Sequence, residues 1–513
     1  MDKKEQFHWA DEVAEKVIKA HGNKEAYTVA SGTTPSGIVH MGNFREIITA
    51  DLVVKALQNK GKKVRFIYSW DDYDRFRKVP KNIPQDYEKY IGMPVSEVPD
   101  PYKCHKSYAE HFEKEFEESL KKVNIKPEFI RQSEMYKACK YAEGIKITLN
   151  NKHKIAEILN KYRNEHLLDD WWPVSIYCEK CKKDFTKVLN YDGKYAIEYE
   201  CDCGFKDKID FRKQGNIKIA WRPDWGMRQY YEKVDFEPAG KDHYAAGGAR
   251  YTTNEIVEMV WKRKHVTDLA YEWISVKGGK QFSSSQGIVI TLNQALEIYE
   301  PEIVRFIFAG TRPNTEFAIS FDADVIKIYA DYDKLERIYF GKEELAEEKL
   351  LKQKRIYELS QVKDIPNEMP FQPNFRHLAM LVQTFKGDVK KVLEHYEKDP
   401  KTELRAKLVW NWVQNYAPEE FTFNLQDKVI ADLNEKEKKA LKILREKLKA
   451  NDYNEETLFE EFYSICQELN IKNTDFFKAA YFALINQEKG PRLASFILAV
   501  GKKKVINILN TLL

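Results

Sequence analysis

The residue types best suited to chemistry lie in one short stretch, residues 35–43 (PSGIVHMGN), between a predicted strand at residues 27–30 and a helical pattern. His40 and Asn43 are three positions apart, so at the start of a helix they face the same way. Helix N-termini offer backbone N–H groups and the positive end of a dipole, which both favour phosphate. Gly42 has no Cβ, so a ring or a phosphate can lie against the backbone there. The stretch predicts a cradle for the phosphates of ATP.

A second stretch with chemical potential is the loop at residues 278–287 (GGKQFSSSQG). It follows a predicted strand at residues 271–276 and combines glycines, the cation of Lys280 and three hydroxyls. Such a loop can close over a triphosphate and stabilise the charge of departing pyrophosphate. An ordinary Ser/Gly surface loop is the alternative interpretation. The two stretches strengthen each other because both would lie at the same edge of a sheet.

Four of the seven cysteines form a metal-binding pattern, Cys178-x-x-Cys181 followed by Cys201-x-Cys203. Each tight turn presents two thiolates on one side, and two such turns make a tetrahedron for a structural Zn²⁺ ion. Free thiols are the alternative. Cysteines of this number and pattern in a chain of this length favour a reducing cytosol over a disulfide scaffold. The other three, Cys104, Cys139 and Cys466, are interpreted as ordinary thiols.

The elements that would position these residues follow a βαβ pattern. Apolar residues at helical spacing connect strand-like residues 27–30 and 64–68, which predicts the start of a parallel sheet. Asp71 and Asp72 follow the second strand, where ligands bind in open α/β sheets. Frequent prolines from Pro80 onward predict an insertion, and strand patterns resume at residue 234. Helical patterns dominate after Pro301, including an apolar stripe at Leu441, Leu444 and Leu448.

Composition sets broad limits on function. The chain of 513 residues is 43% hydrophobic and 32% charged, which predicts a globular protein of several domains. Its 84 basic and 80 acidic residues give a net charge of +4, which neither demands nor excludes a nucleic-acid partner. No apolar run approaches the roughly 18 residues of a membrane span, and no signal core follows the first residues.

Several of these stretches together carry a resemblance to a known family. Residues 40–43 (HMGN) resemble the HIGH motif of class I aminoacyl-tRNA synthetases, and residues 281–285 (QFSSS) resemble a variant of their KMSKS loop. More specifically, the chain resembles the class I lysyl-tRNA synthetases. The segments that carry this match are residues 30–37, 69–80, 221–225, 236–243, 415–419 and 490–493.

The resemblance implies activation of lysine by ATP with Mg²⁺, followed by transfer to lysine tRNA. His40, Asn43 and Lys280 would be catalytic. The residues expected to contact ATP are Pro35, Gly37, His40, Gly42, Asn43, Gly240, Asp242, Phe282, Ser283, Ser284 and Ser285. An amino acid with a long stem and an ammonium needs aromatic walls and a carboxylate. The residues expected in that pocket are Gly32, Thr34, Asp71, Trp221, Asp224, His243 and Tyr271.

The loop departs from the family pattern at one position. Gln281 stands where the family has Lys, and Lys280, one residue earlier, is the candidate to replace it. Two rival functions follow: a tRNA-binding paralogue with impaired activation, and a class I synthetase for another amino acid such as glutamate.

The predicted fold class is α/β: a Rossmann-like parallel-sheet catalytic domain with a zinc-bearing insertion, followed by an all-α C-terminal domain. Residues 1–80 and 234–300 would form the split nucleotide-binding domain, and residues 81–233 an insertion that contacts the acceptor end of tRNA. Residues 301–370 would connect it to a helical anticodon-binding domain at residues 371–513. Trp410 and Trp412 could stack on unpaired bases there, or belong to its core. A cytoplasmic monomer is expected.

Overall fold

The computed structural model describes residues 8–277, 290–396 and 399–512. The chain folds into two compact units. The first comprises Met1–Leu296, Pro301–Ile319 and Gly341–Ile365, and the second Glu297–Glu300, Ser320–Phe340 and Pro366–Leu513. In the described part of the chain, no helix is long and apolar enough to cross a membrane.

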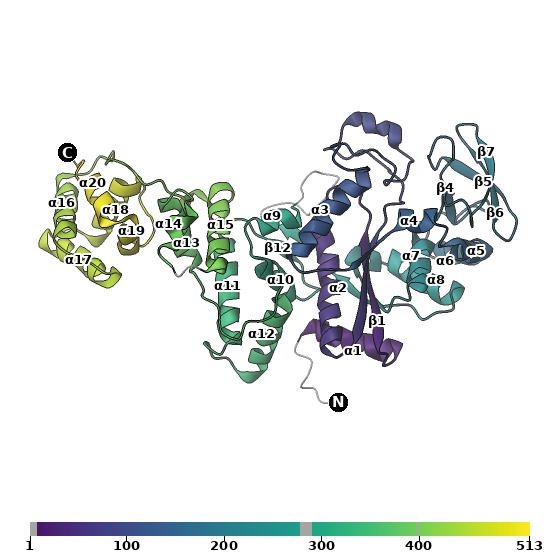
Figure 1. Ribbon diagram of the computed structural model, residues 1–513, viewed down its shortest axis with the longest axis horizontal. Helices are drawn as coiled ribbons and strands as arrows, with labels where there is room; N and C mark the ends of the chain where they lie inside the picture. Colours follow the sequence, from purple (N-terminus) through teal and green to yellow (C-terminus); the bar gives the residue numbers. More distant parts are fainter. Residues whose placement is uncertain (1–7, 278–289, 397–398, 513) are drawn as a thin grey trace. The chain divides into compact units, whose positions relative to one another are not determined.

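The first unit is built on a parallel sheet of five strands in the order β10-β9-β1-β2-β3. Figure 1 labels the central strand β1 beside helix α2. The strands are β1 (Ala26–Thr33), β2 (Lys63–Trp70), β3 (Glu128–Arg131), β9 (Phe236–Gly240) and β10 (Thr267–Tyr271). The strand order reverses between β1 and β9, and such a reversal opens a crevice at the carboxyl ends of the strands. The predicted Rossmann-like sheet is confirmed. One strand, β3, lies within residues 81–233, where the sequence predicts the insertion.

Helix α2 (Met41–Asn59) connects β1 to β2 and packs on the sheet. Its predicted apolar stripe of Ile47, Ile48, Leu52, Val53 and Leu57 is fully buried. The helix therefore begins directly at the carboxyl end of β1 and is held there by its apolar face. Helix α3 covers Tyr108–Lys122.

The predicted strand at residues 271–276 is two strands in the structure. Strand β10 ends at Tyr271, and β11 (Ile274–Val276) pairs with β12 (Phe317–Ile319) in a separate two-stranded sheet. The backbone N–H of Glu272 donates to the carbonyl oxygen of Pro313 at 2.8 Å, which draws the chain out of the parallel sheet.

Between β3 and β9 the chain forms four helices and two small antiparallel sheets. Strands β4 (Val174–Ile176) and β8 (Ile217–Ile219) pair with each other, and β5, β6 and β7 form a three-stranded sheet (Figure 1). The bounds are α4 (Gln132–Lys137), α5 (Ala142–Asn150), α6 (Lys152–Asn160), β5 (Thr186–Tyr191), β6 (Ala196–Cys201) and β7 (Lys206–Asp210). The other helices of this unit are α1 (Trp9–His21), η2 (Gln85–Tyr90), α7 (Trp221–Tyr231), η3 (Lys241–Tyr244), α8 (Ala249–Val260), α9 (Leu292–Leu296), α10 (Pro301–Ala309) and α12 (Glu347–Ser360).

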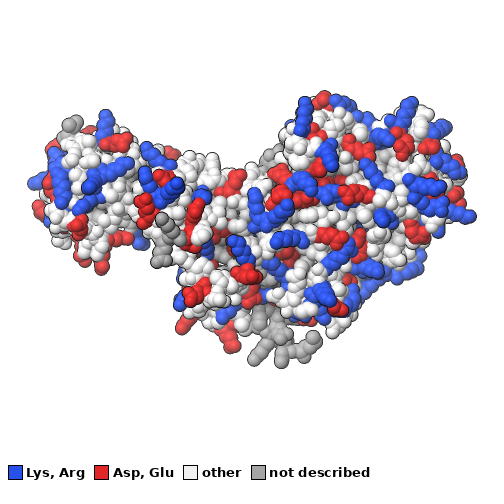
Figure 2. All heavy atoms as spheres, in the orientation of Figure 1, with Lys and Arg blue, Asp and Glu red and all other residues white. Residues whose placement is uncertain are grey.

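The described residues of the second unit form helices and connecting loops but no strands, as the sequence predicts. The apolar stripe of Leu441, Leu444 and Leu448 on α16 is buried in its core. Its elements are α11 (Asp324–Tyr339), α13 (Phe375–Thr384), α14 (Val389–Leu393), α15 (Pro400–Asn415), η4 (Glu419–Phe421), α16 (Glu435–Ala450), α17 (Glu455–Glu468), α18 (Asn473–Ile485), α19 (Leu493–Val500) and α20 (Lys502–Leu509). On the face drawn in Figure 2, Lys and Arg alternate with Asp and Glu over both units, in keeping with the small net charge.

Candidate active site

A cavity of about 690 Å³ lies at the carboxyl ends of β1, β2 and β9, where the strand order reverses. The predicted site residues that line it are Gly32, Thr34, His40, Gly42, Asn43, Asp71, Trp221, Gly240, Asp242, His243 and Tyr271. Pro35 and Gly37 are buried and do not line it. Lys280, Phe282, Ser283, Ser284 and Ser285 lie outside the described residues.

His40 and Asn43 form a capping box at the start of α2. The Nδ1 atom of His40 accepts a hydrogen bond from the N–H of Gly42 at 3.0 Å, and Oδ1 of Asn43 accepts one from the N–H of His40 at 3.1 Å. The amide of Asn43 also donates to the hydroxyl of Thr33 at 3.2 Å, which ties the helix to the end of β1. Both side chains are therefore oriented by the helix terminus that they cap.

The expectation of free backbone N–H groups at this terminus is wrong. Besides the bond from Gly42 to His40, the N–H of Met41 donates to the carbonyl oxygen of Ile290 at 2.8 Å. Because its Nδ1 is an acceptor, the neutral ring of His40 carries its proton on Nε2 and can donate there. Burial lowers the pKa of His40 to about 4, so the ring is neutral at pH 7. The terminus offers side-chain donors and a dipole to an anion.

Two glycines are required by close contacts in the cavity wall. A Cβ atom on Gly42 would lie 2.7 Å from Cε1 and 2.8 Å from Nδ1 of the His40 ring. A Cβ atom on Gly32 would lie 2.6 Å from the carbonyl oxygen of Ser69 on the neighbouring strand β2. Only glycine allows both approaches, since a Cβ atom has no room at these distances.

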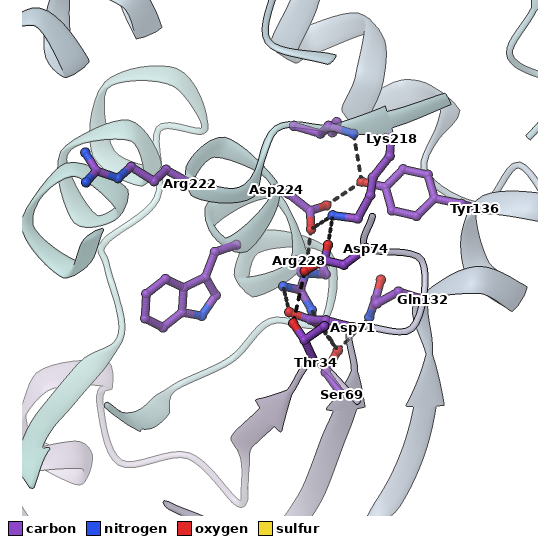
Figure 3. Close-up of polar contacts among 12 residues, drawn as sticks. Thr34, Ser69, Asp71, Asp74, Gln132, Tyr136, Lys218, Arg222, Asp224 and Arg228 are labelled. Carbon is purple, nitrogen blue, oxygen red and sulfur yellow. Dashed lines mark hydrogen bonds and ion pairs between the residues drawn. The ribbon is translucent and has the colours of Figure 1, made fainter. Parts of the chain in front are cut away.

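One wall of the cavity is a buried network of charges (Figure 3). Arg228 donates to Asp71 through Nη1 and Nη2, at 2.5 and 3.1 Å, and Nη1 also donates to the hydroxyl of Ser69. Lys218, which the sequence did not single out, pairs with Asp74 at 2.9 Å and with Asp224 at 3.2 Å. Three carboxylates therefore share two cations, and the network carries a formal charge of −1.

Asp224 belongs to this network and does not line the cavity. Its carboxylate accepts a hydrogen bond from the hydroxyl of Tyr136 and lies within 3.2 Å of Lys218 and Arg228. The residue is 0% exposed. Its place in the first turn of α7, facing inward, could not be read from the sequence, and in this structure it lies behind the cavity wall.

Glu46 is the acid that the sequence analysis missed. Its carboxylate lines the cavity and accepts hydrogen bonds from the N–H of Gly32 at 3.0 Å, from Ser31 at 3.1 Å and from the hydroxyl of Tyr271 at 2.8 Å. Burial, the largest cause, raises the pKa of Glu46 to about 7. Among the described residues it forms no ion pair, whereas Asp71 and Asp74 are paired. Its place in the chain gave a clue to this position, because Glu46 stands one helical turn after Gly42 on the same helix.

Aromatic rings form another wall. The rings of Trp221 and Trp225 are stacked with an interplanar angle of 10°, and His243 lies 5.7 and 5.6 Å from their centres. The indole N–H of Trp225 donates to Glu237 at 2.9 Å. This arrangement suits an aliphatic stem that ends in a cation, because stacked rings offer apolar faces with negative π density.

Besides Arg228, four cations line the cavity without having been predicted as site residues: Arg45, Arg75, Arg77 and Lys78. Arg77 and Lys78 are exposed and form no ion pair in the described part of the chain. The Nη2 atom of Arg45 donates to three backbone carbonyl oxygens, while its buried Nη1 atom has no hydrogen-bond partner among the described residues. These groups can attract a polyanion.

The four cysteines of the predicted metal site converge. The Sγ atoms of Cys178 and Cys203 are 3.7 Å apart, and those of Cys181 and Cys201 are 3.6 Å apart. Four thiolates around Zn²⁺ at about 2.3 Å would be separated by about 3.8 Å. Together with the ligand chemistry, this geometry fits a closed tetrahedral site. Of the remaining cysteines, Cys466 is buried and Cys139 half-buried, while Cys104 lies among other ligand-type side chains.

The second unit contains a cavity of its own, of about 890 Å³, between α13, α19 and the residues that follow α15. Polar and aromatic side chains line it, among them Arg376, His377, Phe421 and Arg492. Trp412 is 0% exposed and its indole N–H donates to the carbonyl oxygen of Phe321. It therefore belongs to the core, which was the alternative to stacking on unpaired bases.

Comparison with known proteins gives matches over nearly the whole chain. Residues 7–363 match the family described as tRNA synthetases class I (K), and residues 406–513 match an anticodon binding domain. Lysine–tRNA ligase of Borrelia garinii subsp. bavariensis is 49% identical, covering 96% of this chain and 97% of that protein. The ligases of Treponema pallidum (98% of each chain) and Pyrococcus horikoshii (97% of this chain, 98% of that protein) are 43% and 42% identical. This chain therefore belongs to the family of class I tRNA synthetases designated K.

Proposed function

We propose that the protein activates lysine with ATP and transfers the lysyl group to lysine tRNA. The observation that carries this proposal is the match to lysine–tRNA ligases along almost the entire chain. The cavity at the sheet's switch point supports it, since it combines a helix N-terminus, exposed cations and aromatic walls.

ATP is assigned to the side of the cavity formed by the start of α2. His40 would donate from Nε2 to a phosphate oxygen, and the positive end of the helix dipole would add to this attraction. Asp242 would accept from the ribose hydroxyls, with Gly240 leaving room for the sugar. Lys280, Phe282, Ser283, Ser284 and Ser285 would cover the triphosphate, and Mg²⁺ bound with ATP would neutralise part of the phosphate charge.

Lysine is assigned to the aromatic side, with its backbone groups near Gly32 and Thr34 and its stem along Trp221, His243 and Tyr271. We assign its ε-ammonium to Glu46. Among the described residues this carboxylate has no cation partner, whereas Arg228 neutralises Asp71, and the hydroxyl of Tyr271 orients the Glu46 carboxylate toward the cavity. A buried carboxylate without a cation is costly, and a substrate ammonium would remove that cost.

The chemistry then follows from positioning. A carboxylate oxygen of lysine attacks the α-phosphorus, the bond from that phosphorus to the bridging oxygen breaks, and pyrophosphate leaves with the electron pair. His40 and the cation of Lys280 stabilise the charge that develops on the phosphates. A terminal ribose hydroxyl of tRNA next attacks the carbonyl carbon of the adenylate and displaces AMP.

The other parts of the chain are assigned to tRNA. The zinc-bearing part of residues 81–233 would contact the acceptor end, residues 301–370 would connect, and residues 371–513 would bind the anticodon. Zn²⁺ would hold the two cysteine turns together and take no part in the reaction, because four thiolates leave no open position. We also propose that the protein acts as a cytoplasmic monomer.

Exchange of radiolabelled pyrophosphate into ATP, measured with a panel of amino acids, tests the function. Lysine-dependent exchange is expected. Exchange with glutamate or another amino acid would assign the enzyme to a different substrate, and no exchange with any of them, in protein that still binds lysine tRNA, would identify a binding paralogue.

A further inference from the structure

We propose that Lys218 is a positioning residue for lysine, which acts on the amino-acid side of the cavity through Asp74 and Thr34. The proposal rests on the proposed function, in which Thr34 meets the backbone groups of lysine. Lys218 lies on β8, where the sequence predicts the insertion, and its side chain does not line the cavity. Its influence on a substrate must therefore pass through residues that do line it.

Two contacts in series connect Lys218 with the cavity (Figure 3). Its Nζ atom lies 2.9 Å from Oδ1 of Asp74, and Oδ2 of the same carboxylate accepts a hydrogen bond from the hydroxyl of Thr34 at 3.0 Å. Asp74 and Thr34 both line the cavity. Because a hydroxyl has a single proton, Thr34 can only accept from a ligand while it donates to Asp74. An acceptor suits the α-ammonium of lysine, which carries donors alone.

The charge of Lys218 keeps Asp74 in the form that accepts. Among the described residues, Lys218 forms the only ion pair with Asp74, and the two side chains are 7% and 13% exposed. Burial by itself would raise the pKa of Asp74, but the charge and hydrogen bond of Lys218 outweigh it and lower that pKa below its ordinary value. Without this cation the buried carboxylate would bind a proton. It could then donate to Thr34, whose own proton would face the ammonium of lysine.

Lys218 is itself held in place, so it can act as a support. Its Nζ atom also donates to Asp224 on α7 at 3.2 Å. The N–H of the next residue, Ile219, donates to the hydroxyl oxygen of Tyr136 at 3.2 Å, and that hydroxyl donates to Asp224. A purely structural ion pair is the alternative role. That role predicts a loss of stability on removal of the charge, with no effect on lysine that depends on Thr34.

Isothermal titration calorimetry of the full-length protein with lysine tests the proposal. Lys218→Met should weaken lysine binding at least about tenfold, while the affinity for ATP changes by less than about twofold. Lys218→Arg keeps the charge and should recover most of the lost affinity. Lys208→Met is the matched control, because Lys208 on β7 is exposed and pairs with Glu198 at the surface. Urea unfolding checks that each variant is folded, and Lys218→Gln replaces Lys218→Met if the latter is not.

A double-mutant cycle separates positioning from a structural role. Thr34→Val removes the hydroxyl through which Lys218 acts, so adding Lys218→Met to it should change lysine affinity by less than about twofold. The proposal would be overturned by wild-type affinity in Lys218→Met, by a loss that Lys218→Arg does not reduce, or by equal losses with and without the Thr34 hydroxyl. Wild-type protein that binds another amino acid but no lysine would instead overturn the proposed function, and this proposal with it.

Discussion

Replacing Glu46 by Gln separates the stability of the protein from its proposed recognition of lysine. Gln keeps the shape of the side chain and an oxygen that can accept from Gly32, and its amide can donate to the hydroxyl oxygen of Tyr271. It removes only the negative charge. The structure therefore predicts opposite effects on the free protein and on its complex with lysine.

In the free protein the change should be stabilising at high pH. Burial raises the pKa of Glu46 from 4.5 to about 7, so folding disfavours its ionised form. That difference corresponds to about 3 kcal/mol at pH values above 7, and contact with water at the cavity reduces it to about 1–3 kcal/mol. The gain should be absent below pH 4.5, grow as the pH rises, and be complete above pH 7. Urea unfolding at pH 4.5 and pH 8 measures it.

In the complex, the same change should weaken lysine binding. Loss of one partner of a buried charge pair costs about 2–5 kcal/mol, which is a rise of about 30- to 5,000-fold in the KM for lysine. The KM for ATP should stay within about twofold. In wild-type protein, lysine affinity should increase between pH 5 and 7.5 as Glu46 ionises, and this dependence should vanish in the variant.

Pyrophosphate exchange at varied lysine and ATP concentrations measures both constants. Glu25→Gln is the matched control because the Glu25 side chain is largely exposed and, within the described residues, pairs only with Lys63 at the surface. An unchanged KM for lysine in Glu46→Gln would refute the assignment of the ammonium. A loss of stability at pH 8 would refute the argument from burial.

Three further changes test other parts of the site. Gly42→Ala should slow pyrophosphate exchange at least tenfold, because the new methyl group displaces the His40 ring. The unfolding free energy should change by less than about 1 kcal/mol, since Ala favours helix. A slowing of less than tenfold would show that the position of the ring is unimportant for exchange. Arg228→Leu should destabilise the protein by about 3–5 kcal/mol in urea unfolding, because it leaves Asp71 buried without its cation; a neutral result would contradict the charge network. Lys280→Ala should slow adenylate formation more than tenfold, and unchanged exchange would reject Lys280 as the replacement for the missing loop lysine.

The fold was predictable where patterns are local. The helix after β1 was predicted because its apolar residues recur at helical spacing, and they are buried as expected. The end of β10 at Tyr271 was not, because the turn depends on a hydrogen bond from Glu272 to Pro313, far along the chain. Likewise β3 joins the sheet only through pairing with β2. Local propensity carries no information about such partners.

The residues of the candidate site were likewise predictable only where their spacing along the chain decides their arrangement. His40, Gly42 and Asn43 were predicted as a group because their spacing on one helix end decides their orientation. Whether the backbone N–H groups beside them were free was not predictable, since the acceptor for Met41 is Ile290. Glu46 was missed because a glutamate in a helix is usually a solvated residue, and only the approach of Gly32 and Tyr271 encloses it.

By itself, the sequence determined the α/β class, the grouping of His40, Gly42 and Asn43 at the start of one helix, the four-cysteine cluster and the family resemblance, because each rests on neighbouring residues in the chain. The tertiary structure decided which acids are neutralised and which can meet a substrate. Asp71 and Asp224 are equally acidic in sequence, yet Arg228 holds the first at the cavity wall and Lys218 helps bury the second. Pairing of charges depends on distances in space, and those exist only in the folded chain.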